Sequence, residues 1–205
     1  MLQSKSFGYL GVALRAMIAF TVLLGVAYPF AIMGAARIFP DQATGSLVTD
    51  SEGDVRGSTL IGQSFSDAQG KPIAKYFQPR PSAAGNGYDA MSSGGSNLGP
   101  NSPVLLKQIA QRRAEVATFN TVPESRVPAD AVTASGSGLD PLISSQYASI
   151  QVERVAKARG LTTAEIEAEV LKAEVDAMPW RSEEPLVNVV LLNLHLDELN
   201  AASAN

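Results

Sequence analysis

The feature that most constrains this chain is an uncharged apolar run near its start, residues 16–36, with the sequence AMIAFTVLLGVAYPFAIMGAA. The hydrocarbon core of a bilayer is about 30 Å thick and is spanned by about 20 apolar residues in a helix. A helix also satisfies its own backbone hydrogen bonds inside hydrocarbon. We therefore predict one transmembrane helix at residues 16–36, kinked near Pro29 because proline interrupts helical hydrogen bonding.

Two other interpretations of this run stay open. One is a buried helix of a soluble protein, although such helices are rarely so long and so uniformly apolar. The other is a cleaved signal peptide, because Gly34-Ala35-Ala36 resembles a small-residue cleavage site and Lys5 and Arg15 lie upstream. Signal sequences usually carry an apolar region of about 7–15 residues, so the length of this run favours a retained anchor.

The basic residues around the run predict its orientation. Lys5 and Arg15 precede it, whereas Arg37 follows it with Asp41 close by. An excess of Lys and Arg marks the cytoplasmic side of a membrane helix. We therefore expect a single-pass protein of the inner (plasma) membrane, with a cytoplasmic N-terminus and the rest of the chain on the periplasmic side.

This organisation divides the chain into three parts. Residues 1–15 are expected to form a cytoplasmic leader with no fold of its own, residues 16–36 the transmembrane helix, and residues 37–205 one extracytoplasmic domain. A chain of 205 residues leaves room for one water-facing domain of ordinary size. The predicted fold class is a single N-terminal transmembrane helix followed by one α+β extracytoplasmic domain.

Composition argues against several classes of function. The formal net charge of -4 and the pI of about 5.0 argue against nucleic acid as a partner, since phosphate contacts need clustered cations. The chain has no cysteine, which excludes disulfides and thiolate metal sites. Its single histidine, His195, argues against a histidine-based metal site or catalytic triad, and we expect it to be a satisfied structural residue. We therefore expect no metal site and no catalytic site in this chain.

Capping residues predict three helices in the water-facing part. Ser102, followed by proline, predicts a helix that fades near residue 120. Ser144 predicts a second helix, which Gly160 ends. Thr162 and Glu165 form the pattern of a capping box at the start of a third.

The remaining elements are short strands and loops. Strands are predicted at residues 47–48 and 58–61, and a long surface loop rich in Gly, Ser, Asn and Pro at residues 76–103. The third helix is expected to end at Met178-Pro179. Apolar and polar residues alternate over residues 187–197, which predicts a final strand with one buried face.

The predicted helix pair at residues 152–173 resembles a helix-turn-helix. Its second helix begins with Glu165, Glu167 and Glu169, at the end that would face DNA. These carboxylates would repel phosphates, so we interpret the pair as a helical hairpin that packs on a sheet.

Two glycine-containing loops supply the candidate site residues. The sequence Ser-Gly-Gly-Ser at residues 93–96 resembles loops that wrap phosphate, but no lysine follows in a P-loop arrangement. Gly94 and Gly95 predict a backbone geometry that a Cβ would oppose, or a partner that approaches closely. Ser96 belongs to the same loop, and the Asn97 side chain can hold its turn. Asp140, which precedes a proline, predicts an Asx turn.

Four stretches together point to a family. They are Tyr76-Phe77 with Arg80-Pro81-Ser82-Ala83; the sequence SGGSNLGP at residues 93–100 with Pro103; SGLDP at residues 137–141 with Ile143-Ser144; and Glu184-Pro185 with Val187-Asn188-Val189 and Leu192-Asn193-Leu194. In this order behind one N-terminal anchor, they resemble the C subunit of the bacterial Kdp potassium-transporting ATPase. The chain departs from the family pattern at Asn101-Ser102, where the family has Thr-Asn, and at Leu142, where a histidine is frequent.

The resemblance implies a role in a complex that uses ATP to take up potassium at low external concentration. The implied partners are a channel-like potassium-binding subunit, a P-type ATPase subunit, a small single-span subunit and membrane lipid. The C subunit itself has no ATPase site; it is described as an assembly factor and catalytic chaperone that raises the affinity of the pump subunit for ATP. The implied cofactor is thus at most ATP shared with the pump subunit.

The predicted orientation conflicts with direct contact to ATP, because ATP is scarce outside the cytoplasm. A domain on that side could instead cover the potassium entrance of the channel-like subunit, or steady the complex through its cycle. The expected loop or partner contacts are Gly94, Gly95, Ser96, Asn97, Asp140 and Asn188. The alternatives are a membrane-tethered extracytoplasmic enzyme, against which the missing acid–base constellation argues, and a membrane-anchored regulator.

Overall fold

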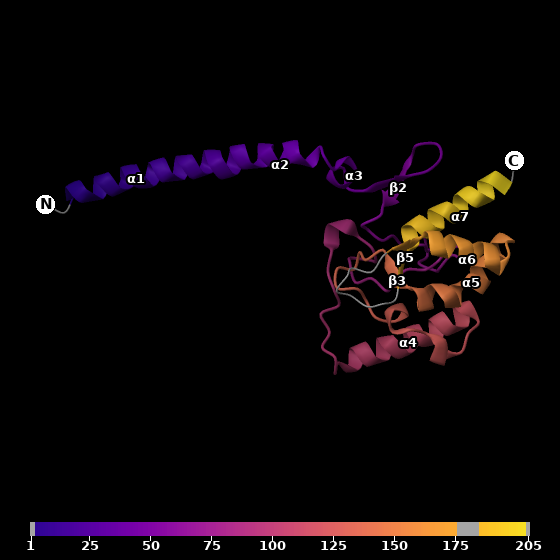
Figure 1. Ribbon diagram of the computed structural model, residues 1–205. Helices are drawn as coiled ribbons and strands as arrows, with labels where there is room; N and C mark the ends of the chain where they lie inside the picture. The colour runs from indigo at the N-terminus through magenta and orange to yellow at the C-terminus, as the bar shows by residue number, and fades with distance from the viewer. Residues whose placement is uncertain (1–2, 176–184, 204–205) are drawn as a thin grey trace. The chain divides into compact units, whose positions relative to one another are not determined.

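The computed structural model describes residues 3–175 and 185–203 of the chain (Figure 1). The chain divides into two compact units, Met1–Ser46 and Leu47–Asn205. The first unit contains α1 (Gln3–Val22), the π-helical turn η1 (Leu23–Ala27), α2 (Tyr28–Ala36) and α3 (Pro40–Ala43). The predicted boundaries of leader, span and domain stay a prediction.

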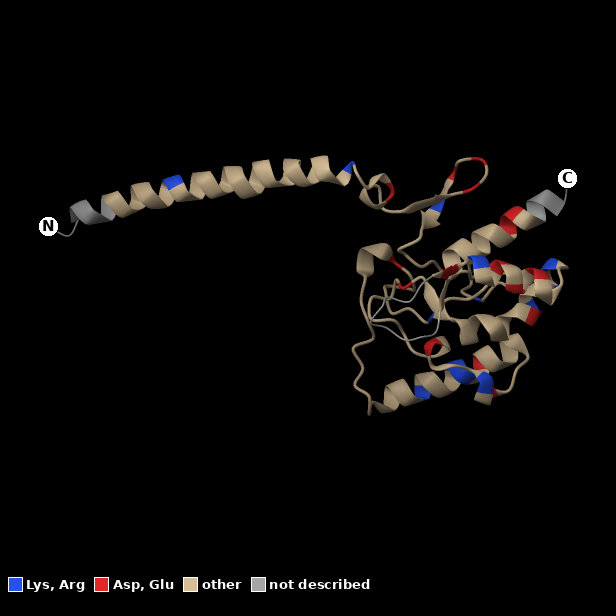
Figure 2. Cartoon of the chain, in the orientation of Figure 1, with Lys and Arg blue, Asp and Glu red and all other residues tan. Residues whose placement is uncertain are grey.

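The first unit contains one helix that could cross a membrane. The segment Gly8–Ala36 is helical throughout and has a mean hydropathy of 2.1. Among the described residues, it is the one helix that is long and apolar enough to cross a membrane. Arg15 is its one charged residue (Figure 2). The predicted apolar helix is therefore confirmed. The helix begins at Gln3, so residues 3–15 are helical and continuous with the apolar segment.

The helix changes its hydrogen-bond pattern just before Pro29. Proline lacks an N–H group, and its ring collides with the carbonyl of the residue four positions earlier, here Gly25. The turn η1, which contains Gly25, is π-helical and lies directly before α2. A π-helical turn opens the ladder at this point. The disturbance predicted at Pro29 thus takes the form of a widened turn.

The second unit is a mixed domain of helices and two small sheets, which confirms the predicted α+β class. Its elements are β1 (Leu47–Thr49), β2 (Val55–Ser58), the 3-10 turns η2 (Ala90–Ser92), η3 (Glu124–Arg126) and η4 (Ala129–Ala131), α4 (Pro103–Asn120), β3 (Leu142–Ser144), α5 (Ser145–Arg159), α6 (Thr163–Lys172), β4 (Glu174–Val175), β5 (Leu186–Asn188) and α7 (Val189–Ser203). Strands β1 and β2 form an antiparallel hairpin, and a second antiparallel sheet has the order β3-β5-β4.

The core of this domain is built around α5, which packs between α4 and α6 (Figure 1). Its inner face carries the fully buried residues Ala148, Gln151 and Val155. Ile166 of α6, Val187 of β5 and the buried residues of α7 complete the same cluster. A continuous apolar core of this kind is the main favourable term in folding.

The three predicted helices and their caps are confirmed. Ser102 accepts a hydrogen bond at the start of α4, and Ser144 does so at the start of α5. Thr162 and Glu165 form the predicted capping box of α6. Gly160 follows α5 in the left-handed conformation that favours glycine. The Glu165 carboxylate accepts hydrogen bonds from the N–H and hydroxyl groups of Thr162, and these bonds lower the pKa of Glu165.

The predicted final strand at residues 187–197 is wrong, because β5 ends at Asn188 and α7 begins at Val189. The Asn188 side chain explains the change of structure. Its Oδ1 accepts hydrogen bonds from the N–H groups of Val190 and Leu191, at 3.1 and 3.2 Å, and so caps the helix. An apolar run this dense satisfies the period of a strand and that of a helix at once, so alternation alone could not decide.

Other sequence boundaries are partly corrected. The strand at residues 47–48 is confirmed as β1, but residues 58–61 form a turn after β2, closed by an isolated bridge between Ser58 and Ile61. Helix α6 ends at Lys172, earlier than predicted, and Met178-Pro179 lies outside the described residues. The predicted loop at residues 76–103 contains η2 as its one regular element before α4 begins at Pro103.

Two buried amide side chains hold an irregular segment, residues 74–78, against the helices. Asn193 of α7 accepts from the N–H of Phe77 at 2.8 Å and donates to its carbonyl at 2.9 Å. Gln151 of α5 accepts from the N–H of Gln78 at 2.7 Å and donates to its carbonyl at 3.2 Å. Both amides are at most 1% exposed. Each amide thus satisfies an N–H group and a C=O group of a segment that belongs to no helix or strand.

Two arginines of α5 bind the carbonyl groups of the same segment. Arg154 donates to the carbonyls of Ala74 and Tyr76, and to Gln151 Oε1 at 2.9 Å. Burial lowers the pKa of Arg154 to about 10, so it stays charged at neutral pH. Arg159, whose side chain is fully buried, donates to the carbonyl of Lys75 at 2.7 Å. Segment 74–78 is therefore held through its backbone by side chains from two helices.

We predict that Gln151→Leu lowers the free energy of unfolding by about 2–4 kcal/mol, because it leaves the polar backbone groups of Gln78 without their partner. Gln146→Leu is the matched control, because Gln146 lies on the same helix and is exposed; its effect should stay within about 0.5 kcal/mol. Denaturant unfolding of the full chain in detergent, followed by circular dichroism, measures both. Equal effects of the two substitutions would contradict the assignment.

Candidate functional site

Three of the sequence stretches singled out above meet in the structure. Hydrogen bonds join residues 80–88, 93–95 and 135–142, and we call this assembly the motif junction. The N–H of Gly94 and the hydroxyl of Ser93 both donate to the Ser137 carbonyl at 2.9 Å. The N–H of Ser135 donates to the carbonyl of Pro81 at 3.3 Å. Loops far apart in the chain thus share backbone contacts.

Ser82 lies at the centre of the motif junction. Its hydroxyl donates to the carbonyl of Gly138 at 2.6 Å and accepts from the N–H groups of Ala84 and Tyr88, at 3.1 and 2.9 Å. The Tyr88 hydroxyl in turn donates to the carbonyl of Arg80 at 2.7 Å. Burial raises the pKa of Tyr88, so its phenol stays protonated and remains a donor.

Glycine is required where these loops cross most closely. Gly138 has a φ of +69°, and a Cβ there would lie 2.7 Å from the carbonyl oxygen of Gly94. A Cβ on Gly62 would lie 2.8 Å from the carbonyl oxygen of Asp140 and 2.6 Å from the Tyr88 ring. Side chains at these two positions would separate the loops.

The two predicted glycines, Gly94 and Gly95, differ in how closely the rest of the domain approaches them. Neither Gly94 nor Gly95 has a positive φ. A Cβ on Gly94 would meet nothing within 4 Å, whereas one on Gly95 would lie 3.0 Å from the carbonyl oxygen of Gly136. A Cβ is therefore opposed by close approach at Gly95, and at neither position by the backbone angle. Gly95 approaches its own domain, and the space beside Gly94 is open.

Ser96 and Asn97 form the outward part of the loop. Both are exposed, and Asn97 adopts a left-handed conformation with a φ of 52°, which asparagine tolerates better than most residues. Apolar side chains are exposed on either side of this loop: Met91 is 95% exposed before it and Leu106 is 58% exposed after it. The loop is thus bonded to the rest of the domain at Ser93 and Gly94, and exposed apolar residues precede and follow it in the sequence.

Asp140 ties the motif junction to the sheet. Its Oδ1 accepts from the N–H of Leu142 at 3.0 Å, which confirms the predicted Asx turn. Its Oδ2 accepts from Arg80 Nη1 at 3.1 Å, and both side chains are mostly buried. Asn188 lies next to this turn, because it pairs with Leu142 in the sheet and donates to the carbonyl of Thr59 at 2.8 Å. At 2% exposure it supports the loops from within.

Sequence reasoning did not select Ser82, Tyr88, Gly62 or Gly138 as site residues. Ser82 and Gly138 lie inside the quoted stretches, but nothing in the sequence says that they bond to one another. The expectation for His195 is wrong, because its Nδ1 is buried without a hydrogen-bond partner, 3.9 Å from Glu169 Oε2. It lies on α7 and is not one of the residues that form the motif junction.

The chemistry of the motif junction is that of a rigid contact surface. Its polar side chains are bonded mainly to backbone groups of neighbouring loops, and the Arg80–Asp140 pair joins two of its stretches. Serine hydroxyls and a protonated phenol, without a base bonded to them, do not form a nucleophile–base pair. The arrangement is suited to presenting residues 93–101 in one conformation.

Comparison with known proteins agrees with this layout. The model of the family described as "K+-transporting ATPase, c chain" matches residues 10–198. A protein of Beijerinckia indica subsp. indica is 47% identical over 90% of this chain and 91% of its own length, and one of Caulobacter sp. (strain K31) is 49% identical over 87% of each chain. A protein of Mycobacterium tuberculosis (strain H37Rv) is 45% identical over 91% of this chain and 96% of its own length. All three are named potassium-transporting ATPase KdpC subunit. With nearly its whole length matched, the chain belongs to the KdpC family, the c chain of K+-transporting ATPases.

Proposed function

We propose that this chain is a non-catalytic accessory subunit of an ATP-driven potassium uptake complex. The observation that carries the proposal is the family match over residues 10–198, which includes both the apolar helix and the motif junction. The relatives are named as subunits of a potassium-transporting ATPase, and they have nearly the same length as this chain. A subunit role is consistent with a site built for contact rather than for bond-making chemistry.

The proposed partners are a channel-like potassium-binding subunit, a P-type ATPase subunit and a small single-span subunit. The apolar helix offers small residues for close packing against membrane partners, at Gly25, Ala31, Gly34 and Ala35. In the domain, the surface offered to a partner is the exposed loop of the motif junction with Met91 and Leu106 beside it. The chain would assemble and steady the complex through these two contacts.

The proposed effect on ATP is indirect. With Lys5 and Arg15 on the cytoplasmic side, the domain lies outside the inner membrane, where it cannot share a nucleotide with the pump subunit. A catalytic chaperone in this orientation raises the ATP affinity of the pump by favouring one conformation of the assembled complex. Its domain is then free to lie over the potassium entrance of the channel-like subunit.

Removal of this chain should abolish the potassium-dependent ATPase activity of the complex, because the remaining subunits lose their stabilising contacts. The activity is measured on complexes purified from membranes with and without the chain, together with copurification of the other subunits. Full activity of a complex that lacks the chain would overturn the accessory role. Copurification with an unrelated set of proteins would favour the enzyme or regulator alternatives.

Topology is tested with reporters at the C-terminus. Alkaline phosphatase, which is active only outside the cytoplasm, should be active there, and a fluorescent protein that folds only in the cytoplasm should stay dark. The same two reporters fused to the N-terminus are the control and should give the opposite result. A bright C-terminal fluorescent fusion would reverse the orientation and restore direct contact with ATP. A mature protein that begins near Arg37 would instead show cleavage.

The contact surface is tested by a bulky side chain at an exposed position. Ser96→Trp should leave the melting temperature of the full chain unchanged, because Ser96 is exposed, but should reduce potassium-dependent ATPase activity at least about tenfold by blocking a partner. Ser125→Trp is the matched control, since Ser125 is exposed in η3, outside the motif junction. If both complexes keep full activity, the motif junction serves only its own domain.

A further inference from the structure

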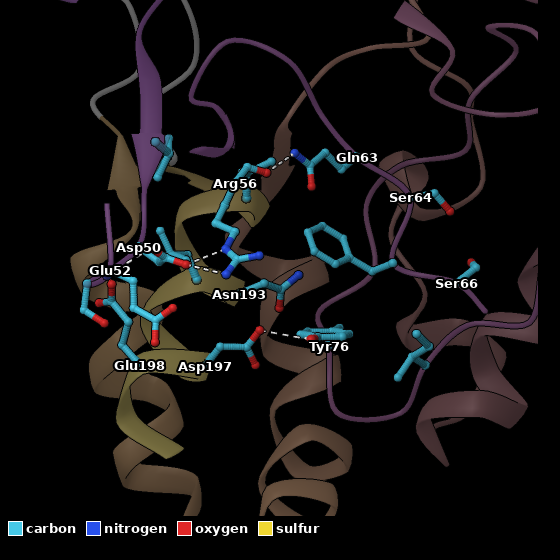
Figure 3. Close-up of a pocket in the computed structure, with 16 residues that line it drawn as sticks. Asp50, Glu52, Arg56, Gln63, Ser64, Ser66, Tyr76, Asn193, Asp197 and Glu198 are labelled. Carbon is cyan, nitrogen blue, oxygen red and sulfur yellow. Dashed lines mark hydrogen bonds and ion pairs between the residues drawn. The ribbon is translucent and has the colours of Figure 1, made fainter. Parts of the chain in front are cut away.

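A second site lies outside the motif junction. A cavity of about 590 Å³ opens between the turn that joins β1 to β2, residues 63–76 and α7 (Figure 3). All of its lining residues belong to the unit Leu47–Asn205, so the cavity is a property of the domain itself. Ligand sites in proteins are concave and largely apolar, with a few polar groups that select the ligand. This volume is within the range of small-molecule sites.

One part of the cavity wall is apolar. Val48, Phe65, Ile73, Val190 and Leu194 contribute to it. The Phe65 ring contacts the Tyr76 ring, with the two centroids 5.4 Å apart. Tyr76 and Asn193 belong to the network that holds segment 74–78, so this wall is fixed by buried hydrogen bonds. A hydrocarbon stem would gain free energy here by displacing water.

The charged groups of the cavity are predominantly acidic. Four carboxylates line it, those of Asp50, Glu52, Asp197 and Glu198, against the single guanidinium of Arg56. Two of the four are already engaged. Asp50 accepts from Arg56 at 2.5 Å, and Asp197 accepts from Arg159 at 2.9 Å and from the Tyr76 hydroxyl at 3.0 Å. Burial alone would raise the pKa of Asp50, but the hydrogen bonds from Arg56 and from the backbone have the larger combined effect. The net pKa of Asp50 is therefore lowered, and its carboxylate stays ionised.

The other two carboxylates are available to a ligand. Neither Glu52, from the hairpin turn, nor Glu198, from α7, forms an ion pair with another described residue. Both line the cavity (Figure 3). An anion would be repelled by this pair of charges. A bare metal ion would gain nothing from the apolar wall, whereas an organic cation with a hydrocarbon stem would use both parts of the cavity.

We propose that this cavity binds a primary alkylammonium group, with its charge near Glu52 and Glu198 and its hydrocarbon stem along the wall formed by Phe65, Ile73 and Leu194. An ammonium group carries three donors that suit exposed carboxylate oxygens. Its source is either a free polyamine or a lysine side chain of a partner protein. This binding site is independent of the motif junction and of the proposed role in potassium uptake.

The test uses the full chain in detergent micelles and isothermal titration calorimetry at low, constant ionic strength. Butylammonium should bind saturably and roughly tenfold more tightly than methylammonium, because its three additional methylene groups contact the apolar wall. Replacing both free carboxylates, in Glu52→Gln with Glu198→Gln, should weaken butylammonium binding about tenfold. Potassium chloride at the same ionic strength should not displace butylammonium.

The matched control replaces two exposed helical carboxylates outside the cavity, in Glu153→Gln with Glu167→Gln. It removes the same net charge and should leave butylammonium binding within about twofold. Equal weakening by the two double variants would show a general charge effect and overturn the site. Equal affinity for methylammonium and butylammonium, or no saturable binding, would also overturn it.

Two further probes identify the source of the ammonium group. Spermidine represents free polyamines, and a Gly-Lys-Gly peptide with blocked ends represents a lysine side chain of a partner. If spermidine binds more tightly than the peptide, and the Glu52 and Glu198 replacements weaken its binding, the site is assigned to polyamines. Tighter binding of the peptide with the same sensitivity assigns it to a partner protein. Failure of both to bind would overturn the proposal.

Discussion

The domain depends on how segment 74–78 is held. A segment that packs on the core outside any helix or strand must still have its backbone N–H and C=O groups bonded. Here the amides of Gln151 and Asn193 form these bonds, with two arginines of α5. Because the donors come from α5 and α7, the segment connects the two helices. Loss of one amide would leave buried polar groups bare, which costs more than a typical hydrogen bond contributes.

This constraint also sets the position of the motif junction. Residues 80–84 follow segment 74–78 after a single residue, Pro79, so their starting point is fixed by the buried amides. From there Ser82 and the Arg80–Asp140 pair bring in the loop that contains Gly138. The loop at residues 93–95 then bonds to the Ser137 carbonyl. An exposed surface with little regular secondary structure is thus supported by side chain to backbone bonds rather than by a sheet.

The same buried network also supports the cavity. Tyr76 lines the cavity and donates to Asp197, and Asn193 lines it while bonding Phe77. The core of the domain therefore supports two separate surfaces, one with exposed apolar groups and one with free carboxylates. Neither resembles a catalytic constellation, which agrees with membership of a family named for a subunit of a transport ATPase.

Local signals in the sequence determined much of this protein. The uncharged run predicted the apolar helix, and Ser102, Ser144, Thr162 and Gly160 predicted helix ends, because capping is decided by residues that are neighbours in the chain. The alternation of residues could not decide that residues 189–203 form a helix, since a dense apolar run fits both periods. The tertiary structure decided it, because β5 pairs with β3 and β4 only as far as Asn188, whose side chain then caps α7. The tertiary structure also decided where glycine is required, which is at Gly62 and Gly138 rather than at Gly94. Such requirements come from loops far apart in sequence that approach within about 3 Å, and the physical reason is that close approach depends on the whole fold and leaves no pattern at a fixed spacing.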